Sequence, residues 1–181
     1  YGDVIRVLIR IVEEKDHYMR GHSENVTKLS VKLTLALGLS RAAAEEVREA
    51  SLLHDIGKIA VDQNILNKPG PLTREEYKKI MQHPVIGARI ISQSNAFKHL
   101  VPGVRHHHER YSGGGYPNPK LRQNNIPLYA RIISIADAWD AMRSDRAYRK
   151  SMPREEAINE IAQCSGTQFD PQIVKVFLSI I

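Results

Sequence analysis

The stretch Ser51-Leu-Leu-His-Asp-Ile-Gly-Lys58 places an imidazole, a carboxylate and an ammonium group close together in an otherwise apolar run. If the run is helical, His54 and Lys58 share a face because they are four residues apart, and Asp55 is offset by about 100°. A buried unpaired charge costs several kcal/mol, so these groups need compensating partners. Two explanations are open: a core ion pair between Asp55 and Lys58, or a site for a metal and an anionic substrate.

Further candidate ligands favour the metal site. The chain has eight histidines, and several of them lie near expected helix ends or turns. The candidate ligands are His22, His54, Asp55, His83, His107, His108 and Asp137. This set is larger than one tetrahedral ion can use, so it indicates two or three ions. Imidazole and carboxylate without thiolate suit Fe, Mn, Co, Ni or Zn, and paired ions about 3.5–4 Å apart commonly serve phosphoester hydrolysis.

Each candidate ligand also has a simpler interpretation. His83 can be a helix-cap or surface residue, and the run 106–108 can be a solvated stretch of histidines. Asp137 can instead form an ion pair with Arg131 or Arg143. For all of these interpretations to hold at once, several coincidences would be needed, so taken together they are weaker than the metal site.

Composition and charge bound the class of protein. The 181 residues suffice for one domain with a real core, and 42% hydrophobic with 25% charged residues is ordinary for a globular chain. The net charge of +6 comes without a long basic run, so a small anionic ligand fits as well as nucleic acid. Cys164 is the sole cysteine, which favours a reducing, cytoplasmic location. No apolar run approaches the ~18 residues of a membrane span.

The apolar pattern and the cap residues predict helices throughout and no strand. Gly38 suits a helix C-terminus, Ser40 is expected to cap the next helix, and Thr73-Arg-Glu-Glu76 has the form of a capping box. Asp170 and Pro171 suit the start of the last helix. The expected helices are 3–19, 23–37, one after Ser40 that carries His54 and Asp55, one from 73 towards 83, 85–94, one leading to 106, 127–151, one from Pro153 and one from Pro171. The prediction is an all-α bundle with one long Gly/Pro-rich loop, residues 110–126.

A series of motifs then resembles one family, in order and at near-family spacing, from about Asp16 to Phe177. The family is HD-GYP, a group within the HD superfamily. The motifs are His54-Asp-Ile-Gly-Lys58, His83-Pro-Val-Ile-Gly87, His107-His-Glu-Arg110, Gly115-Tyr-Pro117, Ile126-Pro127, Ala130-Arg-Ile132 and Asp145-Arg-Ala-Tyr-Arg-Lys150.

The resemblance implies an HD-superfamily helical bundle that hydrolyses cyclic di-GMP to pGpG and/or GMP by attack of a metal-bridging hydroxide. It implies two divalent transition-metal ions, Fe or Mn, at the positions of His54, Asp55, His83, His107, His108 and Asp137. Asp55 would bridge the ions, and Lys58 would face the scissile phosphate to neutralise charge or protonate the leaving oxygen. Tyr116 would stack on or line a guanine, while Arg146 and Arg149 would contact phosphates.

His22 has two interpretations. Some family members hold a third metal with this histidine and a glutamate four residues earlier, where this chain has Tyr18. Asp16 would lie off the face of His22, and Glu14 is two turns away from it. We therefore expect two ions, with His22 either a hydrogen-bond partner of a ligand or an adventitious ligand of a third site.

The loop before and after the Gly-Tyr-Pro motif departs from the family pattern. Ser112 stands where the family commonly has Asp or Asn, and the stretch 118–125 lacks the usual acidic residues. Lys120 and Arg122 make that stretch more basic. These positions are not expected metal ligands, so the departures bear on substrate preference and partners.

The leading hypothesis is a cyclic di-GMP phosphodiesterase. An alternative from another class is a catalytically weak module that binds cyclic di-GMP and signals to a partner; the complete ligand set argues against it. A third is an HD hydrolase of another nucleotide, such as cyclic GMP-AMP. Nucleic-acid binding is the weakest alternative, because the positive charges are dispersed.

Domain organisation also follows from the resemblance. Residues 1–181 are expected to form a single HD-GYP catalytic domain from a longer protein with an N-terminal regulatory region. Family members are usually joined to a sensory or receiver domain, and this chain begins at Tyr1 rather than Met. A homodimer is compatible with a first helix that continues upstream.

Overall fold

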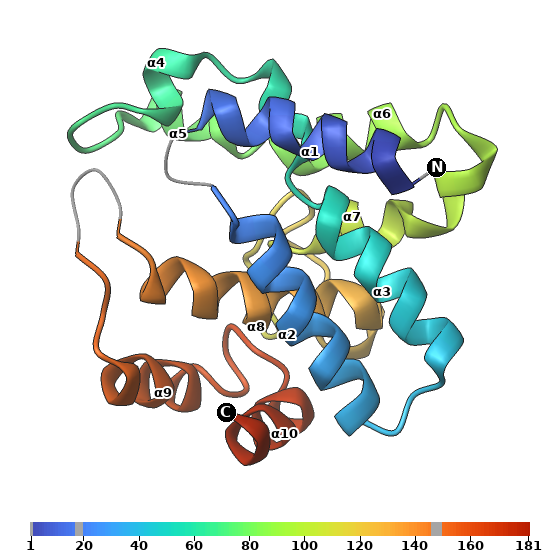
Figure 1. Ribbon diagram of the computed structural model, residues 1–181. Coiled ribbons are helices and arrows are strands. Elements are labelled where there is room, and N and C mark those ends of the chain that lie inside the picture. The colour runs from blue at the N-terminus through green and yellow to red at the C-terminus, as the bar shows by residue number, and fades with distance from the viewer. Residues whose placement is uncertain (1, 17–19, 146–149) are drawn as a thin grey trace.

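The computed structural model describes residues 2–16, 20–145 and 150–181, without the side chains of residues 2–4. Helices account for the regular structure of these residues (Figure 1). The elements are α1 (Gly2–Lys15), α2 (His22–Ala36), α3 (Arg41–Leu53), η1 (Ile56–Ala60), α4 (Gln63–Leu66), α5 (Arg74–Ile80), α6 (His83–Ile91), η2 (Asn95–Leu100), α7 (Val101–His106), η3 (Gln123–Asn125), α8 (Leu128–Arg143), α9 (Arg154–Gln163) and α10 (Pro171–Ile180), where η marks a 3-10 helix.

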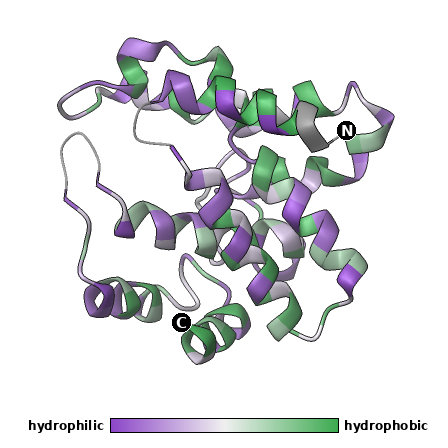
Figure 2. Ribbon diagram, viewed as in Figure 1, coloured by the Kyte–Doolittle hydropathy of each residue, from purple (hydrophilic) through white to green (hydrophobic). Residues whose placement is uncertain are grey.

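The core lies between α2, α3 and α8, which pack on one another at the centre of the bundle (Figure 1). Leu33, Val47, Ile132 and Ile135 are fully buried there. Burying one such aliphatic side chain stabilises the fold by roughly 1.5–3 kcal/mol relative to leaving it exposed. Figure 2 shows α10 as mostly hydrophobic, in keeping with its position against α2, α8 and α9.

The expected helix starts are confirmed by their hydrogen bonds. The Ser40 hydroxyl accepts from the backbone N–H of Ala43 at 3.1 Å. Thr73 and Glu76 form the full capping box. The N–H of Glu76 donates to the Thr73 hydroxyl at 3.2 Å, and the N–H of Thr73 donates to the Glu76 carboxylate at 2.7 Å. These bonds satisfy donors that a helix N-terminus otherwise leaves free. The carboxylate of Asp170 likewise caps α10.

The histidine and aspartate at the centre of the sequence pattern do not lie inside a helix. The third helix ends at Leu53, and the 3-10 turn η1 begins at Ile56, so the α-helical face expected for His54 and Lys58 is wrong. The 3-10 turn packs closely on another part of the backbone: a Cβ at Gly57 would lie 1.9 Å from the carbonyl oxygen of His83. The turn therefore carries the chain directly against the start of α6.

The helix expected over 127–151 is also wrong at its end, because α8 stops at Arg143. Ser144 has extended backbone angles, and the Asp145 carboxylate accepts a hydrogen bond from the N–H of Ser151 at 2.6 Å. The chain then returns, so that the N–H of Met152 donates to the carbonyl of Met142 at 2.7 Å.

Strand structure in the described part of the chain is limited to one isolated bridge between Ser165 and Phe169. This finding confirms the all-α prediction. Within the same ranges, every helix is too short or too polar to cross a membrane.

Candidate metal centre

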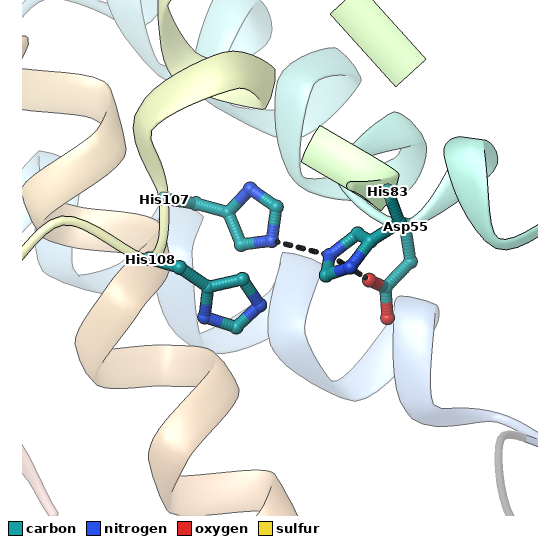
Figure 3. A group of neighbouring side chains, drawn as sticks. All are labelled: Asp55, His83, His107 and His108. Carbon is teal, nitrogen blue, oxygen red and sulfur yellow. Dashed lines mark hydrogen bonds and ion pairs between the residues drawn. The ribbon is translucent and has the colours of Figure 1, made fainter. Parts of the chain in front are cut away.

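The candidate ligands come from separate elements and meet at one place. His22 begins α2, His54 and Asp55 follow α3, His83 begins α6, His107 and His108 follow α7, and Asp137 lies within α8. They form two neighbouring groups, and within each group one ligand atom per residue lies within 4.8 Å of the others: Asp55, His83, His107 and His108; and His22, His54 and Asp137. The first group is shown in Figure 3.

Helix C-termini orient three of the histidines. The Nδ1 atoms of His54, His83 and His107 lie 2.6–2.7 Å from backbone carbonyl oxygens three residues earlier in the sequence. The carbonyls are in the last turns of α3, α5 and α7, where they have no partner within the helix. Since a carbonyl only accepts, each Nδ1 carries the proton, and the neutral ring presents the Nε2 lone pair to the cluster.

These lone pairs need a hydrogen-bond donor or a cation. The Nε2 atoms of His83 and His107 lie 3.3 Å apart (Figure 3), yet with both Nδ1 atoms protonated neither can donate to the other. The Nε2 atom of His54 is buried without a hydrogen-bond partner. Buried polar atoms are rarely left unsatisfied in native proteins, and neutral imidazole nitrogens are common metal ligands. The residues present therefore fit divalent metal ions.

The pKa values of two of the imidazoles, His107 and His108, favour the neutral ring, and those of Asp55 and Asp137 favour the ionised carboxylate. Burial, with the neighbouring histidines, holds the pKa of His107 well below its ordinary value and lowers that of His108 to about 3. Burial alone would raise the pKa of Asp55, but Lys58 and His54 outweigh it and hold that pKa well below its usual range. Neutral imidazole and ionised carboxylate are the forms that bind metals.

Asp55 is placed to contact both groups of ligands. Its Oδ1 atom lies 3.0 Å from the Nε2 of His83, whereas its Oδ2 atom lies 3.4 Å from the Nε2 of His54 and 3.8 Å from that of His22. One oxygen thus faces each group, which is the arrangement that a bridging carboxylate requires.

Lys58 is close to the same carboxylate. Its Nζ atom donates to the Oδ2 of Asp55 at 2.7 Å, so the core ion pair considered from the sequence is present beside the histidine cluster. Burial alone would lower the pKa of Lys58, but Asp55 and Asp16 outweigh it and raise that pKa. The ammonium group is therefore charged at neutral pH.

His22 points into the cluster. Its Nε2 atom lies 3.3 Å from Asp137, and its Nδ1 atom lies 2.6 Å from the Oδ2 of Asp140. Burial would lower the pKa of His22, yet Asp137 and Asp140 raise it to about 9. The two carboxylates thus stabilise positive charge at the His22 ring.

Asp140 is the residue that sequence reasoning missed. It is buried beside His22 and belongs to α8, one turn after Asp137. The spacing of three residues on a helix was the available signal, because it places two carboxylates on one face.

Several simpler interpretations of the ligands are wrong. Asp137 pairs with neither arginine considered: Arg131 pairs with Asp170, and Arg143 donates to the carbonyl of Met152 at 2.6 Å. The run 106–108 is not solvated, because His107 is fully buried. His99 is exposed and lies outside the cluster.

One of the residues considered as a further ligand for a third metal, Glu14, is engaged elsewhere. Glu14 forms an exposed ion pair with Arg20 at 3.2 Å. Tyr18 lies outside the described residues, as do Arg146 and Arg149.

The loop with the Gly-Tyr-Pro motif packs Tyr116 against the cluster. The rings of Tyr116 and His108 are stacked, with centroids 4.7 Å apart and planes at 29°. Gly115 permits this approach, since a Cβ there would lie 2.4 Å from the backbone nitrogen of Arg110. The buried carboxylate of Glu109 accepts from the N–H of Asn118 at 2.7 Å and so holds the other end of the turn.

The cluster opens onto a cleft of about 450 Å³, within the range of small-molecule sites. Six of the candidate residues line it: Asp55, Lys58, His83, His108, Tyr116 and Asp137. Tyr77 and Ile80 of α5 line one part of the cleft, while α8, α9 and the segment after α9 line another. In Figure 1, α5 lies above α8 and α9 lies below it.

An all-α bundle with a buried His/Asp cluster open to a cleft defines a helical protein with a site that fits divalent metal. Its sequence matches the HD domain family over residues 6–173, so the chain belongs to that family. This membership confirms the HD-superfamily fold that the HD-GYP resemblance implied.

Curated relatives are named as cyclic dinucleotide hydrolases. The chain is 40% identical to a cyclic di-GMP phosphodiesterase of Thermotoga maritima, over 98% of this chain and 49% of the relative. It is 35% identical to 3'3'-cGAMP-specific phosphodiesterase 3 of Vibrio cholerae, over 93% of this chain and 36% of the relative. The chain therefore spans about half or less of the length of these relatives.

A solved structure shares the fold. A cyclic GMP-AMP specific phosphodiesterase of Vibrio cholerae superposes with a TM-score of 0.74 and 18% identity, over 97% of this chain and 48% of that one. At this identity the likeness concerns the fold alone.

Proposed function

We propose that this chain is the catalytic domain of a metal-dependent phosphodiesterase that hydrolyses cyclic di-GMP to pGpG and/or GMP. The observation that carries the proposal is the set of buried Nε2 lone pairs and ionised carboxylates beside a cleft with a charged lysine. The names of the relatives support the substrate class.

The proposed ligands are the seven residues of the two groups. His83, His107 and His108 would hold one ion together with Asp55, and His22, His54 and Asp137 would hold the other, with Asp55 shared. When bound, divalent ions supply Lewis-acid activation of water and neutralise charge on a phosphoryl group. Fe or Mn is the proposed identity, as the family resemblance implies, and imidazole and carboxylate ligands without thiolate are compatible with either ion.

Lys58 is the proposed general acid or electrostatic partner of the leaving 3′-oxygen. Its raised pKa keeps the ammonium protonated, and Asp55 holds it at the edge of the ligand cluster. Such a fixed charge stabilises a developing oxyanion more than a mobile one does. The ring of Tyr116, fixed on His108, is proposed to line the binding position of a guanine.

The domain is proposed to act in the cytoplasm within a longer protein that carries a sensory or receiver domain, with a homodimer as a compatible assembly. The contact of Arg146 and Arg149 with the phosphates of the substrate stays a prediction.

The test is turnover of cyclic di-GMP by protein purified without oxygen and loaded in parallel with Fe²⁺ or Mn²⁺, with products separated by chromatography. Metal-dependent appearance of pGpG or GMP is expected. Absence of turnover with either ion, despite about two bound ions per chain, would instead favour a cyclic di-GMP sensor.

The second candidate substrate is 3′3′-cGAMP, which the name of one relative specifies. The same assay with this nucleotide compares the two substrates by their kcat/KM values.

A further inference from the structure

The helix α5 contributes no residue to the buried core, yet both of its ends are fixed. Its N-terminus carries the capping box of Thr73 and Glu76, and the Glu76 carboxylate also pairs with Lys68 at 2.7 Å. At the other end, the carbonyl oxygen of Ile80 lies 2.7 Å from the Nδ1 atom of His83, one of the proposed ligands. The helix is therefore held beside the metal centre although its side chains do not build the core.

One side of α5 is apolar and lines the cleft. Tyr77 and Ile80 are three residues apart, so they lie on the same side of the helix, and both line the cleft. The two residues between them, Lys78 and Lys79, are exposed and do not line it. The apolar side of α5 is thus turned to the space onto which the ligand cluster opens.

The ring of Tyr77 is only half covered by the protein, with an exposed fraction of 50%. Other large hydrophobic side chains in the described ranges are also exposed, on α1, α2, η1, α6 and α10, but Tyr77 is the one among them that lines this cleft. Ligand sites are lined mainly by hydrophobic and aromatic side chains, and a half-covered aromatic ring offers one of its faces to a ligand.

A second aromatic ring, that of Tyr116, lines the same cleft. It is stacked on the ring of His108. Burial raises the pKa of the Tyr116 hydroxyl, and Tyr77 adds to the same shift, which indicates that the two phenols are neighbours. The cleft thus brings together two aromatic rings, from α5 and from the Gly-Tyr-Pro loop, beside a site that fits metal ions.

A nucleotide matches this combination, because its phosphate is anionic and its base is planar with apolar faces. Aromatic side chains bind bases by stacking, and every base has a face that can stack. We infer that Tyr77 stacks on a nucleobase of the cyclic dinucleotide whose phosphate lies at the metal centre, an inference that rests on the proposed function. Tyr77 therefore contributes affinity for cyclic di-GMP and 3′3′-cGAMP alike and does not discriminate between them.

The binding test uses the metal-loaded protein and two probes, GMP and ribose 5-phosphate, with affinities measured by calorimetry. Both probes carry a phosphate, and only GMP carries a base. Loss of one stack between a base and an aromatic ring costs about 10-fold or more in affinity, so Tyr77→Ala should weaken GMP binding by about that factor. Binding of ribose 5-phosphate should not change. Tyr77→Phe keeps the ring and should bind GMP as the wild type does.

The kinetic test measures KM and kcat for cyclic di-GMP. A stack that is equally strong in the ground state and the transition state affects KM alone, so Tyr77→Ala should raise KM by about 10-fold with kcat unchanged. Lys78→Ala is the matched control, because Lys78 is the next residue of α5, is exposed and does not line the cleft. It should keep the wild-type KM. Circular dichroism checks the fold, which both variants should retain, since neither residue is buried and alanine favours a helix.

The outcomes separate this inference from the proposed function. Absence of turnover on every cyclic dinucleotide, with GMP binding still weakened in Tyr77→Ala, would overturn the proposed function and keep the stacking role of Tyr77. Unchanged GMP affinity in Tyr77→Ala would overturn the stacking role, as would equal losses of affinity for GMP and ribose 5-phosphate. A loss in Tyr77→Phe as large as that in Tyr77→Ala would also overturn it, because the contact would then belong to the hydroxyl.

Discussion

The Nδ1 atom of His22 lies 2.6 Å from a carboxylate oxygen of Asp140, a residue 118 positions further along the chain. This contact sets the direction of the His22 ring, because a carboxylate only accepts and therefore keeps the proton on Nδ1. The Nε2 atom is then turned to Asp137 and Asp55. Asp140 thus acts on the cluster through His22, as carboxylates behind metal-bound histidines commonly do.

Replacing Asp140 by asparagine should weaken metal binding while leaving the fold intact. An amide in its place accepts the Nδ1–H hydrogen bond of His22 less strongly, and without the negative charge it no longer stabilises positive charge at the His22 ring. Losses of partners behind metal ligands typically cost about 10–100-fold in affinity. The measurement is metal content after titration with a chelator, with circular dichroism as the control for folding. Unchanged retention of metal would show that His22 needs no such partner.

Much of the site could be predicted from residue types alone. His54, Asp55, His83, His107, His108 and Asp137 stand at or beside helix ends or in an apolar helical stretch, and the structure brings them together. Helix ends are readable from caps and prolines, as at Ser40 and Thr73. An imidazole just after a helix end can donate its Nδ1–H to a carbonyl that the helix leaves unpaired. This bond orients the ring, so a histidine whose position can be predicted also has a defined orientation.

The path of the backbone could not be predicted in the same way. The periodicity around His54 continues an apolar helical pattern, but the helix ends at Leu53, and Gly57 in the following 3-10 turn packs against the carbonyl of His83 from a distant segment. After α8 ends at Arg143, the Asp145 carboxylate accepts from the N–H of Ser151 and the carbonyl of Met142 accepts from the N–H of Met152. Contacts between residues far apart in sequence leave no periodic trace in either segment.

Asp55→Ala should abolish activity and reduce bound metal. The two oxygens of Asp55 face different histidines, so its loss removes a ligand from both proposed ions. It also leaves Lys58 without its closest acidic partner. The measurement is the ratio of metal to protein by elemental analysis, together with turnover of cyclic di-GMP. Full retention of metal would contradict the assignment of Asp55 as a bridge.

Lys58→Ala should leave the metals bound and slow turnover by on the order of 10²-fold or more, the usual loss when one preorganised charge is removed from a developing oxyanion. Lys58 contacts the second oxygen of a proposed ligand but is not a ligand itself. The measurements are kcat and metal content on the same preparation. Lys68→Ala is the control, because Lys68 forms its ion pair with Glu76, away from the histidines. Equal rates in wild type and Lys58→Ala would remove Lys58 from the mechanism.

Gly57→Ala should destabilise the protein and disturb metal binding together. The added Cβ would lie 1.9 Å from the carbonyl oxygen of His83 and 2.5 Å from the backbone nitrogen of Gly87, so η1 and α6 must move apart. Overpacking of this kind typically costs about 1–3 kcal/mol. The shift also separates Asp55 from the ring of His83, which lie 3.0 Å apart.

The matched control for this change is Gly70→Ala. A Cβ at Gly70 meets no atom within 4 Å, so the same substitution adds no clash there. Thermal unfolding and metal content are measured for both variants. Gly57→Ala should lower the Tm and the metal content, whereas Gly70→Ala should change neither appreciably. Equal behaviour of the two variants would mean that the close approach of η1 and α6 does not hold the ligands in place.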